Sequence, residues 1–346
     1  MKRWDDDLGF LLRYENVAWY EDGKVRILDR RIYPTKVEYV ICEKHEQVAQ
    51  AITDMVTQSG GPYTAAAMGM ALAAYEAKEF SEKKFNAYME KAAYTLSHAR
   101  PTTVEKMAVI TNRAMNVVKD QLLEGKSGLD IVDAILKDNI ARLNEHYARY
   151  EKIGEHLYGL IPSNGTIMTQ CYAETVIGML LRIAKKQGNE IKFICPETRP
   201  YYQGARLTAS LIHDMGFSAT VISDNMAAYT MKEKSVDVFT SAADVICMDG
   251  HIVNKVGTFQ IALAANYLEI PYFVTGIPNE HHPVVDTAVI EYRNPELVLE
   301  SMGRKHVMSG VKGYYPSFDI TPPKLYEGVV TDKGVYSGYD LKRYFG

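Results

Sequence analysis

The chain has 346 residues, of which 47% are hydrophobic and 24% charged, and its formal net charge at pH 7 is -4. These values are typical of a soluble globular protein of one or two domains. The slightly acidic balance argues against a nucleic acid as the main partner, because nucleic-acid-binding proteins usually carry a basic surface. No apolar run is long enough to cross a bilayer, and no signal peptide is apparent at the N-terminus. We therefore expect a cytoplasmic protein that does not associate with membranes.

The cysteines and histidines give no sign of a disulfide framework or a metal site. The four cysteines show no CxxC spacing, and Cys42, Cys195 and Cys247 are predicted to be buried structural residues. Among the nine histidines, the one cluster is the pair in EHHP, 280–283, which we interpret as part of a solvated loop. We expect no metal and no disulfide.

The N-terminal half predicts a small β element followed by helices. Asp22 and Gly23 stand between two apolar runs, which is a strong signal for a β-hairpin. Beyond residue 43 the apolar residues recur with a helical period. Helices are predicted over 44–56, 64–77, 81–99, 102–125 and 128–150. Residues 1–155 are therefore expected to form a domain with a small β part and a helical part.

The C-terminal half predicts a Rossmann-like domain over 156–346. Short apolar runs suited to buried strands alternate with helical stretches, a pattern that implies crossover connections and a parallel sheet. The predicted strands are 166–170, 191–195, 219–223, 236–242 and 272–277. No GxGxxG motif follows the first strand, so dinucleotide binding has no support. The fold class is therefore predicted to be α/β.

Ligands bind at the carboxyl ends of the strands in such a sheet, so the residues just past those ends are the candidates for a site. Cys171 follows the first predicted strand and Asp244 follows the fourth. The stretch CPETRPYYQGARLT, 195–208, follows the second strand and includes Gln203 among several charged residues. It carries more groups able to hold an anion or a sugar than a connector needs.

Cys171 and Asp244 each allow a functional and a structural interpretation. Cys171 precedes a predicted helix, whose dipole would favour the thiolate; alternatively it is a small buried hydrophobe. Asp244 lies in the apolar run FTSAADVICMDG, where a buried carboxylate must be capped, paired or used chemically. It is either a structural cap or a general acid–base group.

Three stretches before predicted helices could bind an anion. Asn254 and Lys255 precede a helix expected near Gly257, where free amides and a lysine would suit a phosphate; the alternative is a cap with a solvated lysine. The glycine turn 59–62 and Arg100 also precede helices, but each is more often a simple turn or a surface residue.

Taken together, these stretches resemble the methylthioribose-1-phosphate isomerases, which are related to ribose-1,5-bisphosphate isomerases and to the regulatory subunits of initiation factor 2B. The resemblance covers nearly the whole chain, and its most specific parts are ARPTT, ETRPYYQGARLTA, SDNMAAYTM and VNKVGT. It implies an N-terminal β and helical domain, a C-terminal Rossmann-like domain and a homodimer. It also implies catalytic roles for Cys171 and Asp244, and substrate binding by Arg100, Gln203, Asn254 and Lys255.

The chain departs from this family around its site. Ser59, Gly60, Gly61 and Pro62 stand where the isomerases usually have Arg-Gly-Ala-Pro, so an arginine that would help hold the substrate phosphate is missing. We keep Ser59, Gly60 and Gly61 as candidate substrate-binding residues. The residues beside Cys171 and Asp244 also differ from the usual pattern, which favours an isomerase with an altered substrate.

The resemblance implies an aldose–ketose isomerase that converts a pentose 1-phosphate, such as S-methyl-5-thioribose 1-phosphate or a 5-deoxy analogue, to the ribulose 1-phosphate. The alternative is a non-catalytic regulatory protein like the initiation factor 2B subunits. Retention of both Cys171 and Asp244 favours the enzyme. Either a proton transfer or a hydride shift would serve, and neither route requires a metal or redox cofactor.

Overall fold

The computed structural model describes residues 3–100 and 104–346. The chain divides into two compact units, Met1–Ala148 and Arg149–Gly346, each with its own core. The division falls inside one long helix, α6 (Leu129–Tyr158), which is longer than the predicted helix 128–150. Within the described residues, no helix combines the length and the apolar character that a membrane span requires.

The N-terminal unit contains a three-stranded antiparallel sheet with the order β1-β2-β3. Its strands are β1 (Ala18–Glu21), β2 (Lys24–Leu28) and β3 (Tyr39–Cys42), preceded by a short helix, α1 (Tyr14–Val17). The predicted hairpin is confirmed, and its two turn residues, Asp22 and Gly23, have φ of 48° and 75°. Both values suit the tight turn that matches strand twist.

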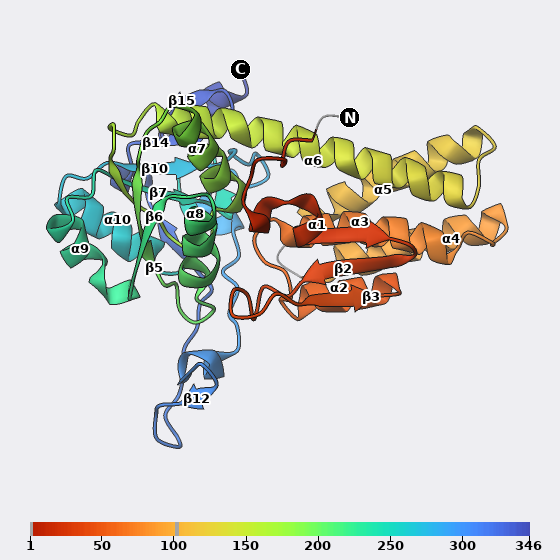
Figure 1. Ribbon diagram of the computed structural model, residues 1–346, viewed down its shortest axis with the longest axis horizontal. Helices are drawn as coiled ribbons and strands as arrows, with labels where there is room; N and C mark the ends of the chain where they lie inside the picture. The colour runs from red at the N-terminus through yellow and green to blue at the C-terminus, as the bar shows by residue number, and fades with distance from the viewer. Residues whose placement is uncertain (1–2, 101–103) are drawn as a thin grey trace. The chain divides into compact units, whose positions relative to one another are not determined.

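Four helices follow, close to the predicted ranges: α2 (His45–Thr53), α3 (Gly61–Glu76), α4 (Glu82–Ser97) and α5 (Val104–Leu123). Helix α3 packs against β1 and β2 as well as α2, α4 and α5, and is buried along most of its length. Its alanines and glycines permit this central position; a Cβ added at Gly69 would lie 2.9 Å from a methyl group of Leu96. Figure 1 shows this helix beside the β1–β2 hairpin.

The C-terminal unit is built on a seven-stranded sheet with the order β15-β14-β10-β7-β4-β5-β6 (Figure 1). All neighbouring strands run parallel except β15, which is antiparallel to β14. The strands are β4 (Thr166–Met168), β5 (Lys192–Pro196), β6 (Ser218–Ile222), β7 (Val238–Ala242), β10 (Tyr272–Thr275), β14 (Gly328–Thr331) and β15 (Gly334–Tyr336). The predicted parallel sheet and its five strands are confirmed, whereas β14 and β15 were not predicted.

Two further sheets in this unit were also missed by the sequence analysis. One has the order β13-β9-β8 and is antiparallel; the other is the small ribbon β11-β12. Their strands are β8 (Val245–Ile246), β9 (Ile252–Lys255), β11 (Glu300–Ser301), β12 (Arg304–Lys305) and β13 (Phe318–Thr321).

Helices cover the main sheet in two pairs: α7 (Glu174–Lys186) packs against α8 (Ser210–Asp214), and α9 (Ala227–Glu233) packs against α10 (Thr258–Tyr267). The sequence analysis did not separate the third and fourth strands by a helix, but α9 stands between β6 and β7. Residues of α9 and α10 share one apolar core with the strands, including Met231, Ile261 and Phe239. Successive strands are added outward from β4 on one side and from β7 on the other, so the strand order reverses between β4 and β7. In open α/β sheets this reversal point, at the carboxyl ends of the strands, is where ligands bind.

Candidate active site

Cys171 and Asp244 follow the two strands between which the order reverses. Cys171 comes three residues after Met168, the last residue of β4, and Asp244 comes two residues after Ala242, the last of β7. The two strands are paired, with Met168 opposite Phe239. Asp244 is among the charges that act on the Cys171 thiol and raise its pKa.

The sequence analysis treated Asp244 as a carboxylate within a buried apolar run, and this was wrong. The run divides into β7 and β8, and Asp244 occupies the bend between them, where its side chain is exposed. Its amide donates to the carbonyl oxygen of Val253 at 3.0 Å, which fixes the bend against β9. An exposed carboxylate at a strand end is open to a ligand.

The backbone of Cys171 is held in a left-handed conformation, with φ of 58°. Its amide donates to Thr198 Oγ1 at 3.2 Å, and the Thr208 hydroxyl donates to its carbonyl oxygen. Its thiol donates to Gln203 Oε1 at 3.4 Å. Non-glycine residues rarely adopt this φ, and such strain is concentrated at functional sites. The CPETRPYYQGARLT stretch therefore fixes both the backbone and the thiol of Cys171.

The ionisation of this thiol differs from the sequence-based expectation. Helix α7 begins only at Glu174, so Cys171 is not in its first turn. Burial raises the pKa of the Cys171 thiol to about 11, although the Lys255 ammonium lowers it in part. Of the two interpretations of Cys171, the thiolate is therefore not favoured in the free protein: at neutral pH the sulfur carries its proton and can act as a donor.

Polar contacts hold the loop after β5 in place. The Asp224 carboxylate accepts from the amides of Thr198 and Arg199, both at 2.7 Å. The Arg199 guanidinium donates to the carbonyl oxygen of Glu300 at 2.7 Å, and Arg206 donates to a carbonyl oxygen of its own loop at 2.9 Å. Both arginines thus make structural contacts, through hydrogen bonds to backbone oxygens.

Gly204 allows this loop to turn back on the strand that precedes it. A Cβ at Gly204 would lie 1.8 Å from the carbonyl oxygen of Pro196, so only glycine fits. A π-helical stretch, Gly204–Ala209, begins here and continues into α8. This turn places Gln203, which is buried, beside the Cys171 sulfur.

Asn254 and Lys255 lie in β9 and are buried, with exposed fractions of 5% and 4%. The alternative of a solvated lysine is therefore wrong. The Lys255 ammonium stands 4.7 Å from the centre of the Phe318 ring, and burial lowers the pKa of this lysine. The Asn254 amide donates to Thr258 Oγ1 at 3.0 Å.

A carboxylate occupies the N-terminus of α10. Asp319 Oδ2 accepts from the amide of Gly257 at 2.6 Å and from that of Phe259 at 3.1 Å. The expectation that free amides at this helix start would hold a phosphate is therefore wrong for these two amides. A ligand phosphate near Lys255 must be held by side chains instead.

The remaining candidates belong to the N-terminal unit. Ser59 is exposed with φ of 59°, and Gly60 precedes the first turn of α3. A Cβ at Gly61 would lie 1.8 Å from Thr57 Oγ1, so this glycine is sterically required. Arg100 is partly buried; the rest of its predicted motif, 101–103, lies outside the described residues.

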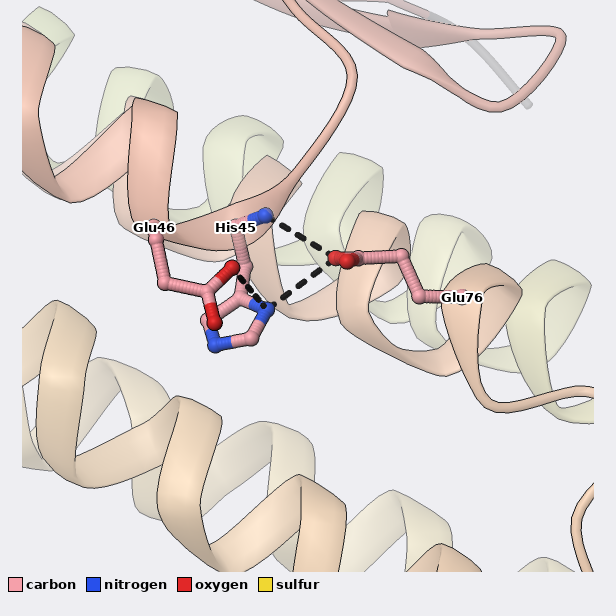
Figure 2. A group of neighbouring side chains, drawn as sticks. All are labelled: His45, Glu46 and Glu76. Carbon is pink, nitrogen blue, oxygen red and sulfur yellow. Dashed lines mark hydrogen bonds and ion pairs between the residues drawn. The ribbon is translucent and has the colours of Figure 1, made fainter.

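One cluster of possible metal ligands was missed by the sequence analysis. Figure 2 shows the ring of His45 between the carboxylates of Glu46 and Glu76, with its Nδ1 at 3.3 Å and 3.0 Å from their oxygens. Glu76 also accepts from the His45 amide at 2.9 Å and from the Tyr88 hydroxyl at 2.9 Å. Hydrogen bonds that join α2, α3 and α4 thus account for the arrangement. Glu76 ends the helix that Gly61 begins, about 22 Å away at 1.5 Å per residue, so this cluster is separate from the glycine turn.

The chain is similar to proteins of one family over nearly its whole length. Residues 58–338 match the Initiation factor 2 subunit family. A methylthioribose-1-phosphate isomerase of Roseiflexus sp. is 35% identical over 333 residues, covering 92% of this chain and 93% of that protein.

Solved structures agree with this match. The 5-methylthioribose 1-phosphate isomerase of Pyrococcus horikoshii OT3 is similar with a TM-score of 0.83 and 29% identity, over 95% of both chains. The translation initiation factor eIF-2B subunit delta of A. fulgidus is similar with a TM-score of 0.80 and 30% identity, over 93% of this chain and 96% of that one.

Proposed function

The chain belongs to the Initiation factor 2 subunit family, and from this premise we propose that it is an aldose–ketose isomerase acting on a pentose 1-phosphate. Its relatives named methylthioribose-1-phosphate isomerase support this activity. The proposed substrate class is S-methyl-5-thioribose 1-phosphate or a 5-deoxy analogue, which places the enzyme in methionine salvage in the cytoplasm.

The observation that carries the proposal is the pairing of Cys171 and Asp244 at the point where the strand order reverses. A sugar 1-phosphate has a blocked anomeric oxygen, so its ring must be opened with help before hydrogen moves from C2 to C1. The Cys171 thiol, protonated at neutral pH, donates a proton to the ring oxygen as the bond from that oxygen to C1 breaks, and the Asp244 carboxylate removes the proton from C2. Asp244 then returns a proton to C1, and the proton of the C2 hydroxyl goes back to the Cys171 sulfur as the ketone forms. Gln203 orients the thiol and offers its amide to the substrate.

The candidate site also includes Asn254 and Lys255 of the same unit, with Arg100, Ser59, Gly60 and Gly61 kept as substrate-binding candidates from the resemblance. Lys255 is the buried cation closest in sequence to the α10 N-terminus, whose amides Asp319 occupies. We therefore assign it to the phosphate. Losing one charge-assisted hydrogen bond costs about 1.5–3 kcal/mol, so Lys255→Ala should raise KM by roughly tenfold to a hundredfold.

The regulatory alternative rests on the similarity to the eIF-2B subunit delta. Turnover separates the two functions. We expect kcat/KM of about 10⁴ M⁻¹s⁻¹ or more on a pentose 1-phosphate, and loss of most activity in Cys171→Ser and Asp244→Asn, with an unchanged melting temperature. The panel comprises methylthioribose 1-phosphate, 5-deoxyribose 1-phosphate, ribose 1-phosphate and ribose 1,5-bisphosphate. Absence of turnover on all four would favour the regulatory function.

We further propose that the chain forms a homodimer. Phe259, Leu263 and Tyr267 recur at intervals of four along α10 and are exposed by 36%, 46% and 86%. Side chains with this spacing share one helix face. Such an apolar stripe is typical of an interface between protein chains.

A further inference from the structure

Arg293 is a buried cation of the C-terminal unit that the sequence analysis did not single out. Its side chain is 9% exposed, in a segment where Tyr292 makes an isolated antiparallel bridge to Pro316. Its Nε and Nη2 donate to the two carboxylate oxygens of Glu291 at 2.9 and 3.0 Å. A buried arginine held this way by one carboxylate has a fixed direction.

One side-chain and two backbone hydrogen bonds connect this segment with the candidate active site. Gln170, which precedes the candidate cysteine, donates from Nε2 to the carbonyl oxygen of Val256 at 3.2 Å. The Val256 amide donates to the carbonyl oxygen of Ser317 at 3.1 Å, and the Ser317 amide donates to that of Glu291 at 2.8 Å. The neighbours of Cys171 and Lys255, and Glu291 two residues before Arg293, are therefore linked in series by hydrogen bonds.

Aromatic contacts provide a second connection between Arg293 and the loop that carries Gln203. The Arg293 guanidinium lies 5.8 Å from the centre of the Tyr201 ring, which in turn is 6.3 Å from the ring of Tyr315. Tyr201 precedes Gln203 by two residues, and Gln203 accepts from the Cys171 thiol. These contacts and the hydrogen bonds above connect the segments that carry Cys171, Lys255 and Arg293.

One edge of the guanidinium remains for a ligand. Glu291 takes Nε and one hydrogen of Nη2, and Nη1 makes no hydrogen bond with any of the residues that the structure describes. The remaining edge of Nη1 and Nη2 has the two-donor geometry that matches two oxygens of a phosphate. In a sugar 1-phosphate the phosphate is attached to a reacting carbon, so its binding cations must lie beside the acid–base groups.

Building on the proposed function, we propose that Arg293 binds the phosphate of the substrate together with Lys255, and that Glu291 is the positioning residue for Arg293. Arg293 and Lys255, both in the C-terminal unit, would supply the positive charge that Ser59 cannot supply. The charge of Arg293 acts on both Cys171 and Lys255, which agrees with this arrangement.

The test measures phosphate binding and turnover separately. Inorganic phosphate is titrated by calorimetry into the unmodified protein and into the variants Arg293→Met, Arg293→Lys and Arg304→Met. The last variant is the control, because Arg304 is exposed in β12. We expect Arg293→Met to weaken phosphate binding and to raise KM for the sugar 1-phosphate by about tenfold to a hundredfold. Arg293→Lys should recover part of both, and Arg304→Met should match the unmodified protein.

Two results would overturn the proposal: phosphate affinity that is unchanged in a folded Arg293→Met, or no phosphate binding by the unmodified protein. The titration does not depend on turnover, so a protein that binds phosphate through Arg293 yet isomerises no sugar would contradict only the proposed function.

If Arg293→Met does not fold, the unmodified protein supplies the test. Bound phosphate should slow alkylation of Cys171 by iodoacetamide at least several-fold, as followed by peptide mass spectrometry. An unchanged rate at saturating phosphate would contradict the proposal.

Discussion

At the residue scale, Cys171 combines a left-handed backbone with a half-buried thiol that donates to Gln203. The free energy of ionising this thiol is set mainly by the loss of water around the sulfur, with Lys255 offsetting part of that cost. A pattern in the sequence can indicate a helix dipole, but it cannot indicate how much water a fold removes from a side chain.

Alkylation of Cys171 should therefore be slow at neutral pH. A pKa of about 11 implies that the reactive thiolate is about one part in ten thousand at pH 7, rising tenfold per pH unit. We expect the iodoacetamide rate to climb steadily from pH 7 to 10, as followed by peptide mass spectrometry. Lys255→Met should slow alkylation further at each pH. A plateau below pH 9 would show that the thiol is more acidic than its burial indicates.

Gly204→Ala should destabilise the protein, because its added Cβ has no room beside the Pro196 carbonyl oxygen. Overpacking of this kind typically costs about 1–3 kcal/mol or more in the free energy of unfolding. We also expect turnover to fall, since the same turn places Gln203. Gly159→Ala is the matched control, because a Cβ there would lie 3.5 Å from the carbonyl oxygen of His156, an ordinary van der Waals contact. Equal urea midpoints for the two variants would contradict the steric argument.

At the element scale, the contacts of Glu76 with His45, shown in Figure 2, and with the Tyr88 hydroxyl join three helices of the N-terminal unit. Burial acts to raise the pKa of Glu76, but hydrogen bonds from His45 and Tyr88 outweigh it, and the net pKa is lowered. A carboxylate whose folded pKa is below its unfolded value stabilises the fold above the unfolded pKa. That contribution disappears as pH falls through the folded pKa.

Glu76→Gln should therefore lower the free energy of unfolding by about 1–3 kcal/mol at pH 7, the range for a hydrogen bond to a charged group. The difference from the unmodified protein should shrink as pH falls below about 4.3, the ordinary pKa of glutamate. Urea unfolding across this pH range measures both effects. Glu79→Gln, at an exposed position, is the control and should change little. A difference that stays constant with pH would exclude the charged form of Glu76 as the cause.

Element boundaries could be predicted from the sequence where the pattern is local. Five of the seven strands of the main sheet and the helices α2 to α6 were predicted from an apolar run or period within each segment. Strands β8, β9 and β13 do not, because β9 pairs with β13 more than sixty residues away and each strand has four residues or fewer. That sheet buries Lys255, so the alternative of a solvated lysine fails because of a long-range strand pairing.

At the scale of the whole molecule, the sequence indicated Cys171, Asp244 and Gln203 as candidate site residues because each follows a strand of the main sheet. Arg293 follows no such strand, and its sequence context, EYRNPE, is that of an ordinary polar loop. The contacts among Glu291, Ser317 and Val256, and that of its guanidinium with the Tyr201 ring, connect it with the other candidates. Residues of a site brought together by tertiary structure alone leave no local pattern to detect.

The homodimer proposal gives a prediction at this scale. Leu263→Glu would place a charge in the exposed apolar stripe of α10, and a buried unpaired charge is strongly unfavourable at an interface. We expect the molar mass from light scattering to fall from that of a dimer to that of a monomer. Tyr339→Glu, at a position exposed by 73%, is the control. A mass unaffected by Leu263→Glu would exclude α10 as the contact.

The carboxylate of Asp319 at the head of α10 acts as an internal anion, covalently part of the chain and always present. A helix start that is already filled cannot tell a phosphorylated sugar from an unphosphorylated one. That discrimination then depends on a few long side chains, each of which a single nucleotide change can replace. Preference for a phosphate at this edge of the sheet should thus be easy to lose and regain during evolution, while the backbone that supports it stays the same.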